Sequence, residues 1–340
     1  MKFGWRGVLG LVISAACLYL AFRNVQWSDA VEHARTANYW LLLLATACAT
    51  GMFPLRARRW RTILDPVAPK LPFGPLWRST AIGMMVNNVV PLRAGEFARA
   101  FALTREVPSV SFSTALASLV VDRVFDAIVV LLLLAISMFG AGFSGATPIM
   151  GGYSITHLAE AFAVAPLAAL LVLYALVFFP DKVIRLFERV ARRVSPSIEH
   201  RGSGVLHRFA DGLSVLRKPT RFIAVFWWTL LHWLLQPLAF WLGLLALGIH
   251  VPSPWSATLF VQGVIVVAVA LPSAPGFFGL FELGATVSLA LFGVSKSDAA
   301  TWALVFHVAS FIPITLIGAY YSARLGLSVG QMESANSGRA

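Results

Sequence analysis

Residues 87–99 read Asn-Asn-Val-Val-Pro-Leu-Arg-Ala-Gly-Glu-Phe-Ala-Arg, and they interrupt a chain that is otherwise strongly apolar. The apolar run before the break, Leu76 to Val90, has 15 residues. As an α-helix it would be about 22 Å long, which is shorter than the hydrocarbon layer of roughly 30 Å. Lipid cannot satisfy the backbone groups that a helix end exposes at that depth. The stretch therefore predicts a broken helix beside a polar cavity.

A second break with the same spacing lies in the other half of the chain. Pro91 and Gly95 are separated by three residues, and so are Pro272 and Gly276, which are followed by Glu282. Paired broken segments in two halves of a membrane protein are the best sequence indication of a transporter site.

Composition and charge set the class of protein. The chain has 340 residues, of which 58% are hydrophobic and 12% are charged, and its mean hydropathy is +0.77. These values predict an all-α, polytopic integral membrane protein. The net charge of +12 is concentrated between apolar runs, which favours positive-inside topology and attraction to anionic lipid over binding of nucleic acid. We expect no cofactor and no metal, because Cys17 and Cys48 form no ligand motif.

Apolar runs and basic segments together predict the topology. The polar segments 56–78 and 181–221 are rich in Lys and Arg, whereas 141–157 and 249–256 contain neither residue type. The basic segments should therefore be cytoplasmic, as should both termini, in a bacterial cytoplasmic (inner) membrane. The expected spans and hairpin arms are 3–22, 39–55, 76–90 with 97–103, 111–140, 158–179, 222–248, 257–271 with 277–292, and 301–322.

This topology gives two halves of opposite orientation, each with three spans and one broken or re-entrant helical hairpin. The predicted transmembrane domain covers 1–325, with repeat one at 1–140, repeat two at 158–325, the cytoplasmic loop at 181–221 and a disordered tail at 326–340. The alternative is that both hairpins are ordinary pairs of full spans. The first apolar run also resembles a signal peptide, but this topology needs it as a span.

Ionisable residues near the first break are candidates for binding an anion. Glu96 and Arg99 are three residues apart, so they can pair on one helical face, and Arg93 lies just before them. Intramembrane charges are expensive and often functional, and guanidinium groups bind phosphate as planar forks. The alternative is that these arginines extend to the cytoplasmic interface. Asn87 and Asn88 belong to the same candidate site.

Two carboxylates on the next span need partners. Asp122 and Asp126 are four residues apart and share a helical face, and Arg93, Arg99 and Arg123 are the candidate counterions. They can belong to the substrate site, or form a structural ion-pair cluster, or do both.

The second break, around Pro275 and Gly276, starts a new helix, and free N–H groups at a helix start bind anions. A plain loop between two spans is the alternative. Glu282, inside the following apolar run, indicates a polar interior. His232, Gln236 and His307 are better explained by hydrogen bonds between helices than by proton relay. The predicted substrate-binding residues are Asn87, Asn88, Arg93, Glu96, Arg99, Asp122, Asp126, Pro275, Gly276 and Glu282.

The two motifs together carry a family resemblance. Asn87-Asn88-x-x-Pro91-x-Arg93-x-Gly95-Glu96-x-x-Arg99 and Pro272-x-x-Pro275-Gly276-x-x-Gly279-x-x-Glu282 resemble the lysylphosphatidylglycerol synthase transmembrane region, or flippase-like family, over residues 5–325. The resemblance implies a region that flips aminoacylated phosphatidylglycerol, followed in full-length synthases by a soluble domain that attaches the amino acid. The resemblance also extends to stand-alone relatives, some of which are associated with polyprenyl-linked sugars or hopanoids. Where the family often has a second glycine, this chain has Phe277.

These patterns favour a protein that binds and translocates an anionic phospholipid or a polyprenyl-linked lipid, with a lipid-synthesising enzyme as a possible partner. The chain ends at Ala340, so we expect the soluble domain to be absent, and no soluble-enzyme motif occurs. The alternatives are a membrane transferase or its accessory subunit, with Asp122 or Asp126 as general base, and a scaffold that transports nothing.

Overall fold

The computed structural model describes residues 5–23, 25–90, 94–139, 168, 171–194, 203, 217–271 and 273–327. Within these ranges the chain is helical and contains no β-strand. The helices are α1 (Trp5–Phe22), α2 (Trp27–Arg35), α3 (Tyr39–Leu64), α4 (Phe73–Val89), α5 (Gly95–Glu106), α6 (Phe112–Met138), α8 (Pro180–Val194), α10 (Pro219–Ala246), α11 (Pro254–Ala268), the 3₁₀ turn η3 (Pro275–Phe277), α12 (Leu280–Ala290) and α13 (Lys296–Arg324).

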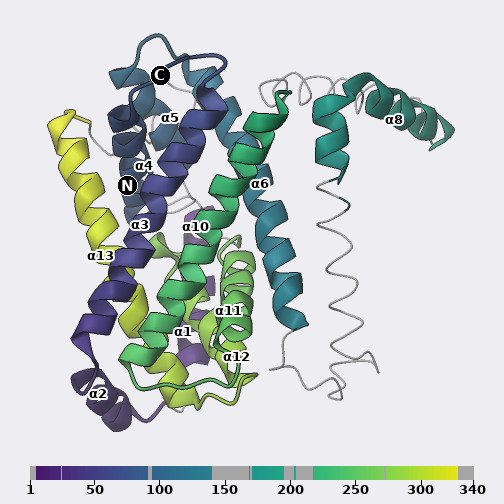
Figure 1. The fold of residues 1–340 in the computed structure, drawn as a ribbon. Coiled ribbons are helices and arrows are strands. Elements are labelled where there is room, and N and C mark those ends of the chain that lie inside the picture. The colour runs from purple at the N-terminus through teal and green to yellow at the C-terminus, as the bar shows by residue number, and fades with distance from the viewer. Residues whose placement is uncertain are drawn as a thin grey trace.

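Long helices set the height of the bundle. Among the described residues, α3, α10 and α13 are long and apolar enough to cross a membrane. At 26, 28 and 29 residues they are about 39 to 44 Å long, more than the hydrocarbon layer requires. Helices α3 and α10 pack along each other, and all three run through most of the height of the molecule (Figure 1).

Two hairpins are built from helices that are too short to span. Helices α4, α5, α11 and α12 have 17, 12, 15 and 11 residues, or about 17 to 25 Å each. The α4–α5 hairpin lies in the upper half of the bundle and the α11–α12 hairpin in the lower half (Figure 1). The turn η3 contacts α4, so the second break lies against the first hairpin inside the molecule.

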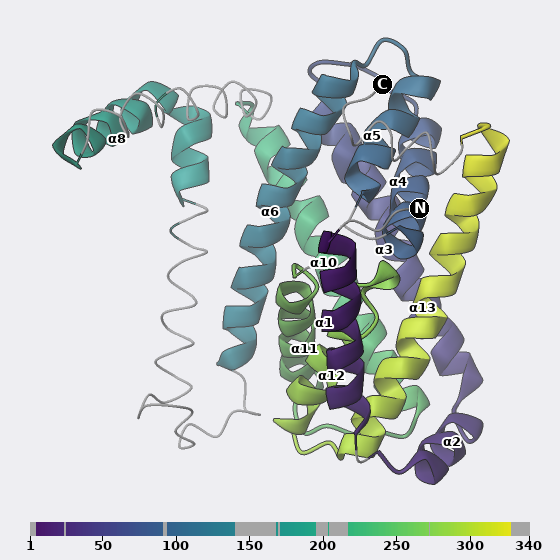
Figure 2. The same ribbon diagram turned by 180° about the vertical axis from the view of Figure 1, so that it is seen from behind.

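Helix α1 covers the second break. It packs on α12 and lies in front of α11 and α12 when the molecule is seen from behind (Figure 2). The hydroxyl of Ser14 accepts a hydrogen bond from the Ala274 backbone N–H at 2.7 Å. This bond satisfies one of the backbone groups that the broken helix would otherwise leave unpaired.

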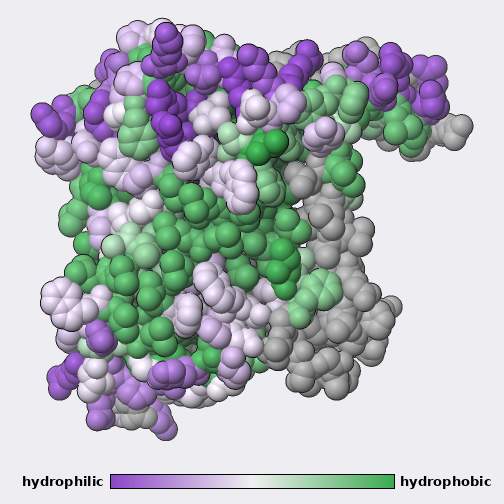
Figure 3. Space-filling model, viewed as in Figure 1, coloured by the Kyte–Doolittle hydropathy of each residue, from purple (hydrophilic) through white to green (hydrophobic). Residues whose placement is uncertain are grey.

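The surface seen in Figure 3 has the pattern of a membrane protein. Hydrophobic residues form a band across the middle, and hydrophilic residues gather at the upper and lower ends. Large apolar side chains such as Trp40, Trp227 and Leu316 are exposed. Water penalises such a surface, whereas lipid does not.

Three segments differ from the sequence expectations. Helix α3 continues through Pro54 to Leu64 instead of ending at residue 55, because its buried face continues through Arg56, Arg59, Trp60 and Ile63 at helical spacing. The segment expected to be a loop at 181–221 begins with α8, whose apolar and charged residues separate onto two faces. The polar connection after the first span contains α2.

Several expectations fall outside the described residues. They concern the connection 141–157, most of the 158–170 part of the fourth span, nearly all of 195–216, the tail from 328, and Pro91, Arg93 and Pro272. The opposite orientation of the two hairpins is visible, but the repeat relationship between the two halves stays a prediction.

Close contact between α4 and α5 gives a test of the first hairpin. A methyl group added at Gly83 would lie 2.7 Å from the Gly95 carbonyl oxygen and 2.9 Å from Arg99 Cβ. We expect Gly83→Ala to destabilise the protein by ~1–3 kcal/mol because the two helices must separate. The apparent thermal unfolding temperature in detergent measures this effect.

The matched control is Gly51→Ala, whose new methyl group would lie 3.7 Å from Leu235 Cδ2, an ordinary contact. This variant should keep the wild-type unfolding temperature or raise it slightly, since alanine favours a helix by up to ~1 kcal/mol. Equal stability of the two variants would contradict the close packing of α4 on α5.

Candidate functional site

The interior of the bundle contains a network of charged side chains from three helices, which we call the buried ion network. Its arginines and carboxylates come from α3, α5 and α6. Its members are Arg56, Arg59, Glu96, Arg99, Asp122, Arg123 and Asp126. Charges at such depth are stable only when they are paired or complemented by a bound ion.

Arg59 is at the centre of the network and is fully buried. Its Nε lies 2.7 Å from Asp122 Oδ1, and its Nη1 lies 2.6 Å from Asp126 Oδ1. The same Nη1 donates to the hydroxyl of Thr229 on α10 at 3.1 Å. One guanidinium group therefore holds α3, α6 and α10 together.

Asp126 has partners on every side. Besides Arg59, its Oδ1 accepts a hydrogen bond from Trp233 Nε1 at 2.7 Å and lies 3.5 Å from His232 Nε2. Its Oδ2 lies 3.2 Å from Arg123 Nη1. This arrangement matches the structural ion-pair cluster that the sequence left open as one role for the two aspartates.

Arg99 pairs with the next helix and stacks on an aromatic ring. Its Nη1 lies 3.2 Å from Asp122 Oδ2, and its guanidinium group lies 4.1 Å from the centre of the Trp60 ring. Because Asp122 attracts it, Arg99 contacts Glu96 only loosely, at 3.9 Å. The main partner of Glu96 is Arg123. The pair predicted from i,i+3 spacing is thus the weaker contact.

Arg56 is the member of the network without a carboxylate. Arg56 is only 7% exposed, and to other described residues its side chain donates one hydrogen bond, from Nη1 to the Met84 sulfur at 3.7 Å. Within the described part of the chain no acidic group lies at ion-pair distance from Arg56, and its Nε has no hydrogen-bond partner. Counted over the described residues, the network has four arginines and three carboxylates, which leaves one positive charge in excess.

The two asparagines before the first break hold the hairpin in place. Asn87 Oδ1 accepts a hydrogen bond from the Gly95 N–H at 2.8 Å, which satisfies a free donor at the start of α5. Asn88 Nδ2 donates to the hydroxyl of Thr315 on α13 at 2.7 Å. Their side chains are thus used in packing the break. Arg93 lies outside the described residues.

The second break forms a separate buried group. Gly276 and Gly279 have positive φ values of 70° and 92°. Glu282 is fully buried, accepts from the Gly279 N–H at 2.6 Å, and lies 2.6 Å from His307 Nδ1. Within the described residues neither Glu282 nor His307 forms an ion pair or hydrogen bond with the buried ion network. Pro275 and Gly276 are in the turn η3, next to this pair.

Phe277 is in a conformation that favours glycine. Its φ of 63° places it in the left-handed region directly after Gly276, which costs about 1–2 kcal/mol for a residue with a side chain. It occupies the position where the resembled family often has a second glycine.

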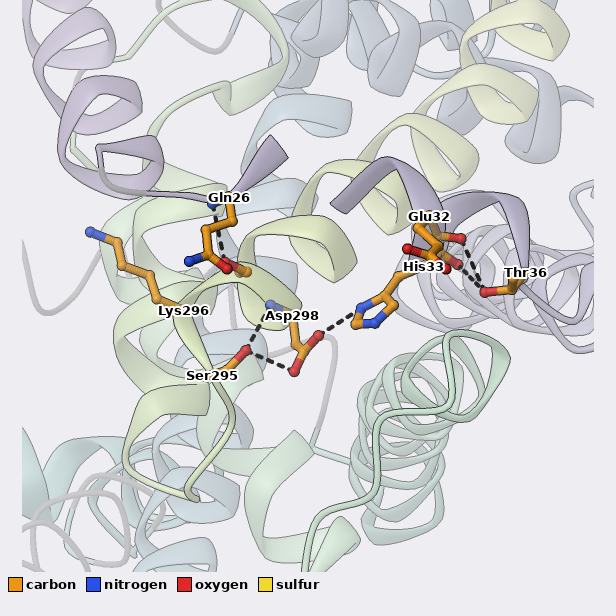
Figure 4. A pocket seen from close by; sticks show the side chains of 8 residues that line it. Gln26, Glu32, His33, Thr36, Ser295, Lys296 and Asp298 are labelled. Atoms are coloured by element: carbon orange, nitrogen blue, oxygen red, sulfur yellow. Dashed lines mark hydrogen bonds and ion pairs between the residues drawn. The ribbon is translucent and has the colours of Figure 1, made fainter. Parts of the chain in front are cut away.

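A polar pocket of about 580 Å³ lies at the lower end of the bundle, between α2 and the start of α13 (Figure 4). His33 points toward Asp298, with 2.8 Å between Nδ1 and Oδ1. The sequence reasoning did not predict this pocket. Its lining residues are Gln26, Glu32, His33, Thr36, Ser295, Lys296, Ser297 and Asp298.

The sequence reasoning also missed the centre of the network. The basic segment predicted at 56–78 includes Arg56 and Arg59, although these two are three residues apart and continue the buried face of α3 after Met52 and Phe53. That helical periodicity was the available signal. The roles of Trp60 and Trp233 follow from tertiary packing and had no local signal.

Removing Arg59 tests whether the network supports the fold. Arg59→Met would leave Asp122 and Asp126 buried with much of their counter-charge lost. We expect a loss of ~3–5 kcal/mol, because breaking a buried pair strands the remaining charges. The measurement is thermal or denaturant unfolding in detergent.

The control for this loss is a more exposed pair. Arg221 and Asp65 are 3.0 Å apart, with side chains 25% and 43% exposed. Arg221→Met should change the stability by about 1 kcal/mol or less. If Arg59→Met lowers the stability no more than Arg221→Met does, the buried pairs do not stabilise the fold.

Comparison with known proteins places most of the chain in a family of membrane proteins. Residues 7–318 match the lysylphosphatidylglycerol synthase TM region. The glycosyltransferase AglD of Haloferax volcanii is 26% identical over 334 residues, which cover 92% of this chain and 53% of that protein. The chain thus spans about half the length of AglD.

Two UPF0104 membrane proteins of Methanothermobacter thermautotrophicus are also similar to this chain. One is 24% identical, and the match covers 84% of each protein. The other is 27% identical, with 92% of this chain and 91% of the relative covered. Because the family match extends over most of the sequence, the chain is a membrane protein that belongs to the lysylphosphatidylglycerol synthase transmembrane region family.

Proposed function

We propose that this protein binds the phosphate of an anionic lipid at the buried ion network and moves that headgroup between the two leaflets. The observation that carries the proposal is Arg56, a buried arginine that, among the described residues, has no carboxylate at ion-pair distance and belongs to a network with one positive charge in excess. An uncompensated charge in an apolar interior is expensive, and a bound anion removes the expense.

A phosphate group fits the available donors. Arg56 Nε and the Nε and Nη2 atoms of Arg99 are buried and have no hydrogen-bond partner among the described residues. Guanidinium groups bind phosphate oxygens through paired N–H donors, and these bonds are among the strongest that side chains form. The acyl chains would remain in the bilayer, against the exposed apolar surface of the bundle.

The two hairpins supply a route for the headgroup. They enter from opposite ends, and the break of the second contacts the first. We infer that the two halves are inverted repeats that expose the network to one leaflet and then to the other by rocking, as in other transporters built in this way. The basic end of the molecule, which includes α8, would face the cytoplasm of a bacterial cell.

The substrate class is a lipid with a phosphodiester or phosphomonoester headgroup. Anionic phospholipids and polyprenyl-linked sugars both carry this chemistry, and the charge of the network selects for the phosphate they share. A lipid-synthesising enzyme that supplies such a lipid is the partner that this function requires.

The name of AglD favours a second candidate, a membrane transferase. In that case Asp122 or Asp126 would act as general base on a lipid-linked substrate. Both carboxylates are already engaged by Arg59, and Asp126 also by Trp233 and Arg123. This engagement makes them better suited to holding the network than to accepting a proton.

Substitution of Arg56 separates binding from folding. Arg56→Met removes the excess charge and strands no carboxylate, so we expect the stability to stay the same or to increase. Lipid scrambling by the purified protein in vesicles should fall at least tenfold, as expected when a hydrogen-bonded charge contact worth ~1.5–3 kcal/mol is lost. Arg56→Lys keeps the charge without the planar fork and should be intermediate.

The matched control is Arg58→Met, because Arg58 lies on the same helix but is exposed. It should scramble lipid at the wild-type rate. Wild-type scrambling by Arg56→Met, or its loss together with a large loss of stability, would contradict the headgroup site. Formation of a covalently modified lipid by the wild-type protein would favour the transferase. If the wild-type protein neither scrambles nor modifies lipid, the scaffold is favoured.

A further inference from the structure

Helix α8 separates its residues into a charged face and an apolar face. At 100° per residue, Asp181, Lys182, Arg185, Glu188 and Arg189 lie on one side, and Val183, Ile184, Phe187, Val190 and Ala191 lie on the other. Such a helix needs an apolar environment along one side and water along the opposite side.

The bundle covers only part of the apolar face. Ile184 is buried in a cluster with Val177 and Phe222, which fixes the start of α8 to the neighbouring helices. Leu186 and Val190, farther along, are 57% and 55% exposed. These two side chains lie one helical turn apart, so the described part of the chain leaves this portion of the apolar face uncovered.

The position of α8 identifies what covers this surface. The helix extends sideways from the upper end of the bundle instead of continuing along it (Figure 1). Its hydrophobic residues lie on the side toward the apolar band, and its hydrophilic residues lie on the outer side (Figure 3). The exposed apolar face therefore lies on the same side of α8 as the hydrophobic band.

The basic residues of α8 favour an anionic lipid as the molecule that this helix contacts. Its polar face carries Lys182, Arg185 and Arg189 against Asp181 and Glu188. Arg185 and Arg189, with Glu188 and Arg192, line a hollow of about 430 Å³. A hollow of this size with several guanidinium groups fits the phosphate of a lipid headgroup.

We propose that α8 lies in the membrane–water interface and binds anionic phospholipid headgroups. Leu186 and Val190 enter the boundary of the acyl chains, and Arg185 and Arg189 contact phosphates of the same leaflet. Each basic residue near an anionic surface raises the affinity about fivefold. This surface is separate from the buried ion network, so lipid binding by α8 does not depend on the proposed transport function.

The test uses the full chain in lipid nanodiscs, with Cys17 and Cys48 replaced by alanine. A fluorophore is attached at Val190→Cys and, as the matched control, at Asp181→Cys on the opposite side of α8. Lipids with brominated acyl chains should quench the label at 190, and aqueous iodide should quench the label at 181. The difference in quenching between the labels at 190 and 181 should be larger with about 30% phosphatidylglycerol than with phosphatidylcholine alone.

Charge reversal tests the anionic preference. The double variant Arg185→Glu, Arg189→Glu should abolish the increase in the quenching difference that phosphatidylglycerol produces. About 1 M salt should have the same effect, because it screens charges beyond a few ångströms. Equal iodide quenching at 190 and 181 would overturn the interfacial position. Protection of 190 from both quenchers would mean that protein, such as a second copy, covers the face, and would overturn it too. If the quenching is the same with and without phosphatidylglycerol, and the same in the wild-type protein and the double variant, the headgroup binding is overturned.

Discussion

The structure depends on one buried guanidinium group, that of Arg59, held between Asp122 and Asp126. A charge in an apolar interior requires its partners at short range, so this group fixes the distances between α3, α6 and α10. Once Asp122 and Asp126 are placed, the positions of Arg99 and Arg123 follow, and Glu96 completes the network through Arg123. Polar contacts thus specify an interior that apolar packing in lipid alone would leave less defined.

The hairpins supply the second constraint. A helix that ends inside the membrane must satisfy its free backbone groups within the protein. The chain does this with side chains close in sequence, as Asn87 does for Gly95 and Glu282 for Gly279, and with a distant one, as Ser14 does for Ala274. Asn87 and Glu282, which the sequence analysis predicts to bind substrate, therefore also stabilise the two helix breaks by accepting hydrogen bonds from backbone N–H groups. The same breaks bring α5, with Arg99 and Glu96, to the depth of the aspartates.

The sequence predicted the helical membrane class and the two breaks, because hydropathy and Pro-Gly spacing are local properties. It also gave Arg99 and Arg123 among three candidate counterions for Asp122 and Asp126, but it did not assign which arginine pairs with which carboxylate. It failed at Arg56 and Arg59, where two rules conflict. A basic run after an apolar run indicates the membrane boundary, whereas i,i+3 spacing indicates a continuing buried face. Burial prevailed because the acids on α6 compensate Arg59. The choice of Glu96 between Arg99 and Arg123 depends on α6, which local spacing cannot reveal.

Compensation also separates the residues that hold the site from those that can serve a substrate. Arg59, Asp122 and Asp126 satisfy one another, so a passing ligand gains little from them and their geometry stays fixed. Arg56 has no such partner in the described part of the chain, and under the proposed function its charge is what an incoming phosphate would neutralise. A carrier must also release its cargo, and one excess charge on a rigid frame binds an anion less tightly than several converging charges would. A network that is nearly but not fully balanced would therefore suit the reversible binding that the proposed lipid translocation requires.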